Sequence, residues 1–309
     1  MASLRSFFIK QYIRSARDTI LFRKHHTDIL KMRRGFELLG SRHLLPKNIY
    51  FKRIFIDHIP AAWIIPQHAQ SDKVMLYLHG GGYAVGSVNT HKSLIAKIAK
   101  KADIQALGID YRLAPEHPFP AAIEDAVRAY RYLLEQGYKP ENLIIAGDSA
   151  GGGLTLATLI TLRNTGIPLP AMGVCLSPWT DLAVTGASVT ERAHLDPMIV
   201  GHLLSEWAKR YAGDTPTNHP LISPLYADLH GLPPLLIQVG SDEVIHDDSV
   251  RFAQKAKEQG TEVTLDVWDS MIHVWQFLWF VLPEANDAIK EIARFIKTKL
   301  GKAEAKATV

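Results

Sequence analysis

The stretch Leu143-Ile144-Ile145-Ala146-Gly147-Asp148-Ser149-Ala150-Gly151 decides the fold of this 309-residue chain. Its first four residues form a short apolar run typical of a buried strand, and residues 152–162 are small and apolar enough for a helix packed against a sheet. Between them, residues 147–151 spell G-x-S-x-G. A serine on such a tight strand-to-helix turn has a strained backbone that exposes its hydroxyl at the carboxyl edge of the sheet. Ser149 is therefore a candidate nucleophile, although the motif alone would equally suit a glycine-rich helix start.

A second glycine cluster, His79-Gly80-Gly81-Gly82-Tyr83, follows the strand-like run 74–78. Three consecutive glycines leave backbone N–H groups uncovered, and such groups can stabilise the negative oxygen that forms during acyl transfer. A phosphate-binding loop is the competing interpretation. However, no Gly-Lys-Ser/Thr follows either cluster, and no G-x-G-x-x-G register fits residues 80–86. We therefore expect an oxyanion hole at this loop.

Composition favours a globular protein of the cytoplasm. The chain is 47% hydrophobic, and it has no apolar run of about 18 residues that would predict a transmembrane helix. The N-terminus lacks a secretory pattern, because Lys10 and Arg14 interrupt the apolar run that begins at Phe7. The single cysteine, Cys175, cannot form an internal disulfide and is expected to be a small buried residue. No Cys/His cluster indicates a metal, and we expect no cofactor.

Positive charge is concentrated in residues 1–34, which hold nine Lys or Arg against Asp18 and Asp28, a net charge of 9 − 2 = +7. The whole chain is +4, which leaves −3 for the remainder. Apolar residues recur there at spacings that suit amphipathic helices, at Leu4, Phe8 and Tyr12 and at Ile9, Ile13 and Ile20. Two interpretations compete: an arm that binds a membrane surface or nucleic acid, and a helical flap over an active site. The catalytic motifs favour the flap and argue against a nucleic-acid partner, while a weak membrane contact through the basic N-terminus stays open.

Strand and helix patterns alternate along most of the chain. Strands are expected over residues 51–65 (one or two), 73–78, 104–109, 142–146, 171–176, 235–239 and 263–267, and helices over 90–102, 121–136, about 247–259 and 285–300. Such alternation predicts a mostly parallel sheet with helices on both faces.

The alternation of strand and helix patterns stops in residues 178–233, where helical patterns at 188–194 and 197–211 occur without a convincing strand. An insertion between two sheet strands lies at the carboxyl end of the sheet, so this segment and residues 1–45 are expected to form a helical cap. The predicted organisation is therefore 1–45 as N-terminal cap helices, 46–177 as the first part of the catalytic domain, 178–233 as the cap insertion, and 234–309 as the second part.

A serine nucleophile needs a base, usually a histidine that a carboxylate orients. In this architecture the chain order is serine, acid, histidine. His273, in the loop after the last expected strand, is the histidine with both the required order and the required position. Asp242 directly follows the strand 235–239 and is the expected acid, whereas we expect the neighbouring Glu243 to point elsewhere from the same loop. Of the nearby carboxylates, Asp247 and Asp248 are expected to cap the following helix and Asp269 to make a loop contact.

Together these motifs resemble the hormone-sensitive-lipase-like family of α/β-hydrolase esterases over essentially the whole length. The resemblance rests on residues 79–83, on Tyr111-Arg112-Leu113-Ala114-Pro115-Glu116-His117, on residues 147–152 and on Ser177-Pro178-Trp179. It implies an α/β-hydrolase fold: a mostly parallel central sheet with helices on both faces, and a helical cap built from N-terminal helices and an insertion after the sixth strand. The site residues implied are the nucleophile Ser149, the acid Asp242, the base His273, and the oxyanion-hole N–H groups of Gly81, Gly82 and Ala150. One departure is visible, since the family often has an aspartate four residues after the acid, where this chain has His246.

The resemblance implies a carboxylesterase that cleaves short to medium acyl esters through an acyl-enzyme. A lactonase, an amidase or a long-chain lipase would use the same triad, and the presence of His273 argues against a non-catalytic ligand-binding protein. The substrate pocket should be apolar, and the residues expected to line it, each of which would equally suit core packing, are Tyr83, Trp207, Tyr211, Val274, Trp275 and Leu278. The partner expected is a small ester, and the last strand could pair edge to edge in a homodimer.

Overall fold

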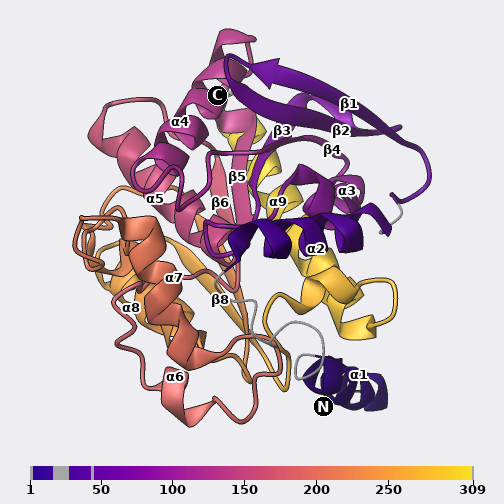
Figure 1. Ribbon diagram of the computed structural model, residues 1–309. Helices are drawn as coiled ribbons and strands as arrows, with labels where there is room; N and C mark the ends of the chain where they lie inside the picture. The colour runs from indigo at the N-terminus through magenta and orange to yellow at the C-terminus, as the bar shows by residue number, and fades with distance from the viewer. Residues whose placement is uncertain (1–2, 17–27, 43–44, 308–309) are drawn as a thin grey trace.

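A computed structural model describes residues 3–16, 28–42 and 45–307. An eight-stranded sheet with the order β1-β2-β4-β3-β5-β6-β7-β8 runs through the centre of this part of the chain (Figure 1). The strands are β1 (Ile49–Ile56), β2 (Ile59–Pro66), β3 (Gln70–Leu78), β4 (Ile104–Ile109), β5 (Leu143–Asp148), β6 (Met172–Leu176), β7 (Leu235–Gly240) and β8 (Val263–Trp268). Only β1 with β2 and β2 with β4 pair in antiparallel fashion, and the other five pairings are parallel. The mostly parallel sheet predicted from the alternating pattern is confirmed.

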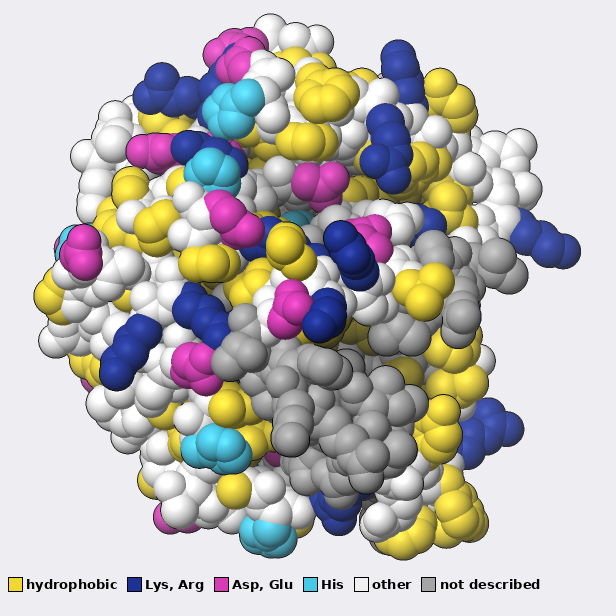
Figure 2. Space-filling model, viewed as in Figure 1, with side chains coloured by type: hydrophobic (Ala, Val, Ile, Leu, Met, Phe, Trp, Pro, Cys, Tyr) yellow, Lys and Arg dark blue, Asp and Glu magenta, His cyan; other side chains and the backbone are white. Residues whose placement is uncertain are grey.

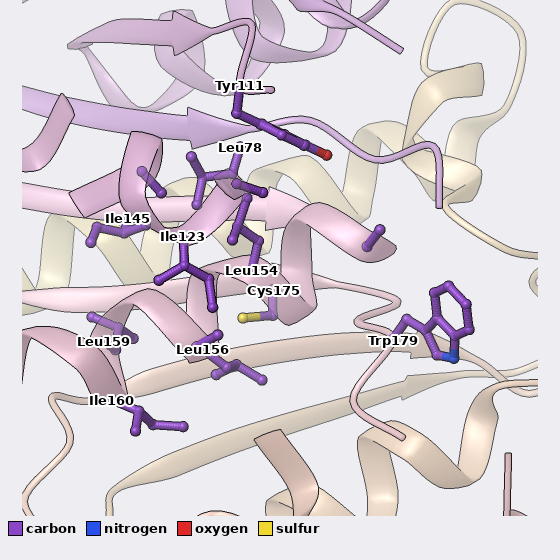
Figure 3. Packing of buried hydrophobic residues seen from close by; sticks show 14 of the residues in the cluster. Leu78, Tyr111, Ile123, Ile145, Leu154, Leu156, Leu159, Ile160, Cys175 and Trp179 are labelled. Carbon is purple, nitrogen blue, oxygen red and sulfur yellow. The ribbon is translucent and has the colours of Figure 1, made fainter. Parts of the chain in front are cut away.

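Helices cover both faces of the sheet. One face packs against α3 (Val88–Ala102) and α9 (Pro283–Ala307), and the other against α4 (Ala121–Glu135), α5 (Ala150–Asn164) and α8 (His246–Glu258). Figure 3 shows the second layer, where Leu154, Leu156 and Leu159 of α5 meet the buried Ile145 and Cys175 of the sheet. Because both faces are covered, β5 is buried along its whole length, which is why its sequence is a continuous apolar run.

Register places the ends of the central strands side by side. Gly147 near the end of β5 pairs with Leu78 at the end of β3, so the serine turn and the glycine loop leave the sheet next to one another. Likewise Gly240 at the end of β7 pairs with Trp268 at the end of β8, which brings together the loops that carry the expected acid and base.

Helices outside these two layers come from the N-terminus and from the segment 178–233. The first group is α1 (Leu4–Ala16) and α2 (Ile29–Arg42); the segment holds α6 (Ser188–Glu191), α7 (Gly201–Ala212) and the 3-10 turn η3 (Pro224–Tyr226), with no strand. Ile20, Arg17, Arg23 and Lys24 of the predicted basic amphipathic region lie outside the described residues. No helix in the described ranges is both long enough and apolar enough to cross a membrane.

The helix expected over residues 197–211 begins only at Gly201, and the preceding one ends at Glu191. Asp196 explains the later start, because its Oδ1 accepts the N–H groups of Met198 (2.8 Å) and Ile199 (3.0 Å) and holds residues 196–199 in a turn. The following Pro197 also disfavours helical backbone at Asp196.

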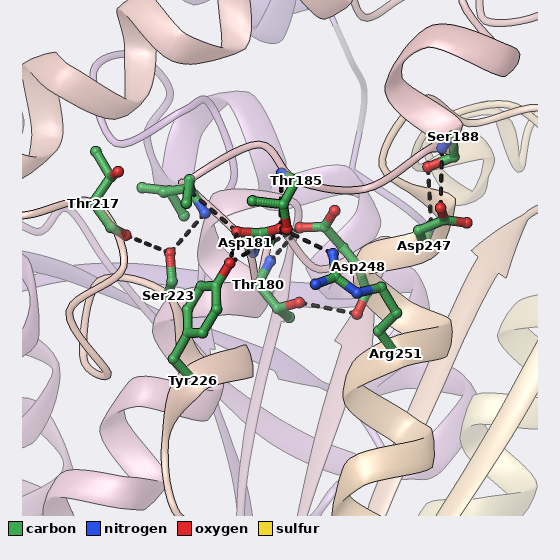
Figure 4. A network of polar contacts seen from close by, with 12 residues as sticks. Thr180, Asp181, Thr185, Ser188, Thr217, Ser223, Tyr226, Asp247, Asp248 and Arg251 are labelled. Atoms are coloured by element: carbon green, nitrogen blue, oxygen red, sulfur yellow. Dashed lines mark hydrogen bonds and ion pairs between the residues drawn. The ribbon is translucent and has the colours of Figure 1, made fainter.

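A buried polar network ties the segment 178–233 to α8 (Figure 4). Asp248 Oδ2 accepts the backbone N–H groups of Thr180 and Asp181, each at 2.8 Å, and Arg251 pairs with Asp181 at 3.0 Å. Asp247 accepts the N–H of Ser188 at 3.0 Å. Asp247 and Asp248 do lie in the first turn of α8, but the expectation that they cap it is wrong, because they make no capping hydrogen bond there and their oxygens hold a neighbouring segment instead. Burial and the adjacent charge of Asp181 raise the pKa of Asp248 well above the usual range.

Candidate active site

Ser149 occupies the turn between β5 and α5 with φ 53° and ψ −122°, a conformation that residues with a side chain rarely adopt. The flanking glycines are required by close packing. A Cβ on Gly151 would lie 2.0 Å from the carbonyl oxygen of Leu78, and a Cβ on Gly147 would lie 2.3 Å from the carbonyl oxygen of Gly151. The turn is further fixed by the Ser149 N–H, which donates to Leu176 O at 2.8 Å. This is the strained serine that the G-x-S-x-G motif predicts.

The glycine loop after β3 also has left-handed backbone, with φ 114° at Gly81 and 59° at Gly82. A Cβ on Gly82 would lie 2.3 Å from the indole ring of Trp207, so the ring packs directly on the backbone there. In the described part of the chain, the N–H groups of Gly81, Gly82 and Ala150 donate to no protein acceptor. Gly81, Gly82 and Ser149 line the same cavity, so these groups are available to an oxygen of a bound substrate.

Two further polar residues, Asp148 and His91, hold this loop, and the sequence analysis did not predict this role for them. Gly80 N–H lies 3.2 Å from both Asp148 Oδ1 and His91 Nε2, and Asp148 also accepts the hydroxyl of Tyr77 at 2.8 Å. Burial would raise the pKa of Asp148, but the charge and hydrogen bond of His91, together with Tyr77, hold it below its usual value. Asp148 is the first x of the G-x-S-x-G motif, directly before Ser149, and this position beside the nucleophile was the signal that the sequence offered.

His273 lies in the loop after β8 and lines the same cavity as Ser149. It is 4% exposed, and its Nδ1 donates to Glu243 Oε2 at 2.9 Å. The other oxygen, Oε1 of Glu243, accepts Ser177 Oγ–H at 2.7 Å and Gly240 N–H at 2.5 Å. Glu243 is fully buried, so its carboxylate is held in one orientation by three donors from three loops.

The structure corrects the expectation that Asp242 holds the histidine. Asp242 Oδ2 pairs with Lys10 of α1 at 2.9 Å instead. Both carboxylates belong to the turn after β7, in which the Glu243 N–H donates to Gly240 O at 3.3 Å. The side chain of residue 243 therefore points inward to His273, and that of residue 242 points out to α1. Lys10 is far away in sequence, so spacing alone could not separate the two neighbours.

The surroundings of His273 act on its pKa in opposite directions. Burial alone would lower the pKa, but the hydrogen bond and charge of Glu243, with the charges of Asp196 and Asp148, raise it above the usual value. A protonated imidazole cannot take the proton of a serine hydroxyl, so the activity depends on the neutral form.

We expect ester hydrolysis to be lost as pH falls through a value above the usual histidine pKa of about 6.5. The reason is that His273 is neutral only above its raised pKa, so kcat/KM is highest on the alkaline side of this transition. The measurement is kcat/KM for p-nitrophenyl butyrate across the acidic and neutral range. An acid limb below the usual histidine value would contradict the inferred influence of Glu243.

The cavity at Ser149 has a volume of about 390 Å³ and is largely apolar. Its walls come from α1, α2, the turn before α7, α7 itself and the loop after β8, and Thr90 and His91 of α3 add polar groups. The apolar lining residues and the glycine of α2 are Ile13, Met32, Phe36, Gly40, Pro197, Met198, Ile199, Val200, Leu203, Leu204, Trp207, Val274 and Phe277. No Lys or Arg lines the cavity among the described residues, which favours uncharged ligands.

Only some of the residues expected in the pocket reach it. Trp207 and Val274 line the cavity. Tyr83 and Tyr211 are buried and stack on one another with ring centroids 3.6 Å apart, and neither lines the cavity. Trp275 is fully buried against Trp268. For Tyr83, Tyr211 and Trp275, and likewise for Leu278 in that second cluster, the core-packing alternative is the correct one.

A strained serine between a parallel strand and a helix, which lines one cavity with a buried histidine and with glycines whose N–H groups have no protein acceptor, defines a serine hydrolase of the α/β-hydrolase class. A family model described as alpha/beta hydrolase fold matches residues 75–277. The acetyl-hydrolase of Streptomyces hygroscopicus is 46% identical over 268 residues, which span 87% of this chain and 88% of that protein.

Solved structures give the same result. An esterase from the bacterial hormone-sensitive lipase family is 44% identical, with a TM-score of 0.92 over 97% of this chain and 99% of that chain. The structure of EstE5 soaked with p-nitrophenyl butyrate is 42% identical, with a TM-score of 0.92 over 97% and 100% of the two chains. The chain belongs to the hormone-sensitive-lipase family of α/β-hydrolase esterases. It is accordingly a carboxylesterase-type serine hydrolase, and the non-catalytic ligand-binding alternative is set aside.

Proposed function

We propose that this esterase cleaves uncharged esters with short to medium acyl chains through an acyl-enzyme on Ser149, with Glu243 rather than Asp242 as the acid of the triad. The observation that carries the proposal is that Ser149 and His273 open onto one apolar cavity while Glu243 binds the far side of His273. The compound soaked into the EstE5 structure, p-nitrophenyl butyrate, is an ester of this class.

In the proposed reaction, the neutral Nε2 of His273 takes the Ser149 proton as the hydroxyl oxygen bonds to the ester carbonyl carbon. Glu243 stays ionised and fixes the tautomer through Nδ1–H. Negative charge moves to the carbonyl oxygen, where the N–H groups of Gly81, Gly82 and Ala150 stabilise it, each by roughly 3 kcal/mol. His273 then gives its proton to the departing alkoxide, and a water molecule repeats the sequence to release the carboxylic acid and restore Ser149.

We further propose that residues 1–45 and 178–233 act as a cap on a catalytic unit formed by 46–177 and 234–309. Support comes from the cavity walls, to which Ile13 of α1, Phe36 of α2 and Trp207 of α7 contribute. Lys10 and Arg14 attach α1 to the body by bonds to Asp242 and to the carbonyl oxygens of His194 and Leu195. The cap would exclude water from the acyl chain.

For p-nitrophenyl esters, we expect kcat/KM to rise by about fourfold for each methylene from acetate to butyrate, since each buried CH₂ contributes about 0.8 kcal/mol. It should fall again for acyl chains too long for a cavity of about 390 Å³ that also receives the alcohol group. The measurement is kcat/KM from acetate to palmitate. A maximum at palmitate would replace the proposal by a long-chain lipase.

Lactones and amides are the remaining alternatives for the same residues. An amide demands protonation of a poorer leaving group, so matched butyryl ester and butyryl anilide substrates distinguish the two activities. A preference for the anilide or for a lactone of similar size would contradict the ester proposal.

A weak contact with a membrane surface is proposed for α1. Leu4, Phe7, Phe8 and Tyr12 are exposed on this helix, which carries Arg5 and no acidic residue. In Figure 2, hydrophobic and basic side chains lie near one another at the lower right, where Figure 1 places α1. Repeating the chain-length assay with anionic vesicles tests the contact, because it predicts faster hydrolysis of the longer esters only when vesicles are present.

Homodimer formation stays a prediction. It is supported by the position of β8 at one edge of the sheet and by the exposure of Val267 on that strand. A reducing, cytoplasmic location likewise stays a prediction from the single cysteine.

A further inference from the structure

The N-terminal helix α2 holds the loop that carries the oxyanion-hole glycines. We propose that Arg33 and Glu37 of α2 are positioning residues. They link the position of this helix over the acyl chain to the orientation of the Gly81 and Gly82 N–H groups. This inference rests on the proposed function at Ser149. Figure 1 shows α2 lying between the ends of the strands and α1, where such a coupling would operate.

Arg33 joins two loops at once. Its Nε donates to Ala84 O at 2.8 Å, and its Nη2 donates to Ala114 O at 2.9 Å. The guanidinium also forms a bidentate ion pair with Glu116, with Nη1–Oε1 at 2.9 Å and Nη2–Oε2 at 2.7 Å. This hydrogen-bonded pair holds the pKa of Glu116 below its usual value, so the carboxylate stays charged and keeps Arg33 oriented. Five donors in a fixed fork suit this set of acceptors, which a lysine could satisfy only in part.

The carbonyl that Arg33 binds belongs to the oxyanion loop. Ala84 N–H and Val85 N–H both donate to Gly81 O, at 3.1 and 3.0 Å, so residues 81–85 form one tight turn. A Cβ on Gly81 would lie 2.2 Å from Val85 O, which shows how closely the turn is packed. Ala114 N–H also donates to Tyr83 O at 2.8 Å. A displacement of Ala84 or Ala114 would therefore rotate the peptides that bear the Gly81 and Gly82 N–H groups.

Glu37 holds the other end of the loop. It accepts hydrogen bonds from Ser87 Oγ and from Asn89 Nδ2, the latter at 2.8 Å. Ser87 caps α3 through Thr90, and α3 carries His91, which contacts Gly80 N–H. Arg33 and Glu37 are four residues apart and so project from one face of α2. Together they hold the loop after its glycines, Arg33 at Ala84 and Glu37 at Ser87.

The residues beside these two on α2, Met32 and Phe36, line the substrate cavity. One helix therefore touches both the bound acyl chain and the oxyanion loop. An acyl chain that packs on Met32 and Phe36 would stabilise α2 in its place over the cavity. Through their hydrogen bonds, Arg33 and Glu37 would then hold the glycine loop in the orientation that the oxyanion requires. The binding energy of the acyl chain, which does not itself react, would then raise kcat as well as lower KM.

The test compares Arg33→Met, Arg33→Lys and Glu37→Gln with Arg34→Met, which removes the same charge from the exposed neighbour on α2. With p-nitrophenyl butyrate we expect kcat of Arg33→Met to fall roughly 10- to 100-fold, as for a misaligned oxyanion donor, with KM changed less than about threefold. Arg33→Lys should recover part of the loss, Glu37→Gln should show a smaller loss of the same kind, and Arg34→Met should match the wild type.

A second measurement excludes a merely structural effect. Inhibition by butaneboronic acid, whose serine adduct is a tetrahedral anion, should weaken in Arg33→Met by about the same factor as kcat. The kcat ratio of butyrate to acetate should also shrink, because the chain no longer acts through α2. If the Arg33 and Glu37 variants match Arg34→Met in kcat and inhibition, the inference is overturned. A wild type without Ser149-dependent turnover would instead overturn the proposed function.

Discussion

Replacing Glu243 by glutamine is expected to lower kcat for p-nitrophenyl butyrate by roughly 10⁴-fold, as when the carboxylate of a serine-histidine pair is neutralised. Glutamine keeps the size of the side chain but removes the charge that holds His273 in the reactive tautomer and stabilises its protonated form. The carboxylate is fully buried and lies 2.9 Å from Nδ1 of His273. The measurement is kcat, with thermal unfolding recorded to show that the variant is folded.

Asp242→Asn is the matched control, since it neutralises the adjacent residue of the same turn. Asp242 pairs with Lys10 rather than His273, so we expect kcat to change by less than about threefold, in keeping with a salt bridge near the surface. If Asp242→Asn removes activity and Glu243→Gln does not, the assignment of the acid made from the structure is wrong and the assignment made from the sequence is right.

Ser149→Ala is expected to reduce turnover by about 10⁶-fold, the loss seen when the nucleophile of such a triad is removed. The residual rate would come from the oxyanion hole and from binding alone. The assay is steady-state hydrolysis of p-nitrophenyl butyrate against the uncatalysed background. Ser177→Ala is a useful comparison, because Ser177 Oγ contacts Glu243 and Val274 N–H without lining the cavity. Activity that survives in Ser149→Ala would place the nucleophile elsewhere.

Local patterns were sufficient to predict most of the fold. The buried strands read as continuous apolar runs because helices cover both faces of the sheet, and the predicted strand at 104–109 coincides with β4. The turn at Ser149 was also predictable, because its glycines answer a local steric demand within the motif. Chain order and loop position alone predicted that His273, and not another histidine, serves Ser149.

The features that the sequence did not predict depend on contacts between distant segments. Glu243 and Asp242 are neighbours of the same charge, and the choice between them is made by Lys10 of α1 on one side and by Ser177 and His273 on the other. Tyr211 and Trp275 are large aromatic residues like Trp207, and the packing of α7 and of the loop after β8 decides which of them faces the cavity.

In the proposed mechanism, ester cleavage passes through an acyl group on Ser149. The most direct test is to mix the enzyme with p-nitrophenyl butyrate, quench in acid within the first turnover, and map the modified peptide by mass spectrometry. We predict one butyryl group per enzyme, carried by Ser149, and none in Ser149→Ala. A butyryl group on another residue, or rapid turnover without an acylated enzyme in a reaction sampled before and during steady state, would rule out an acyl-enzyme on Ser149.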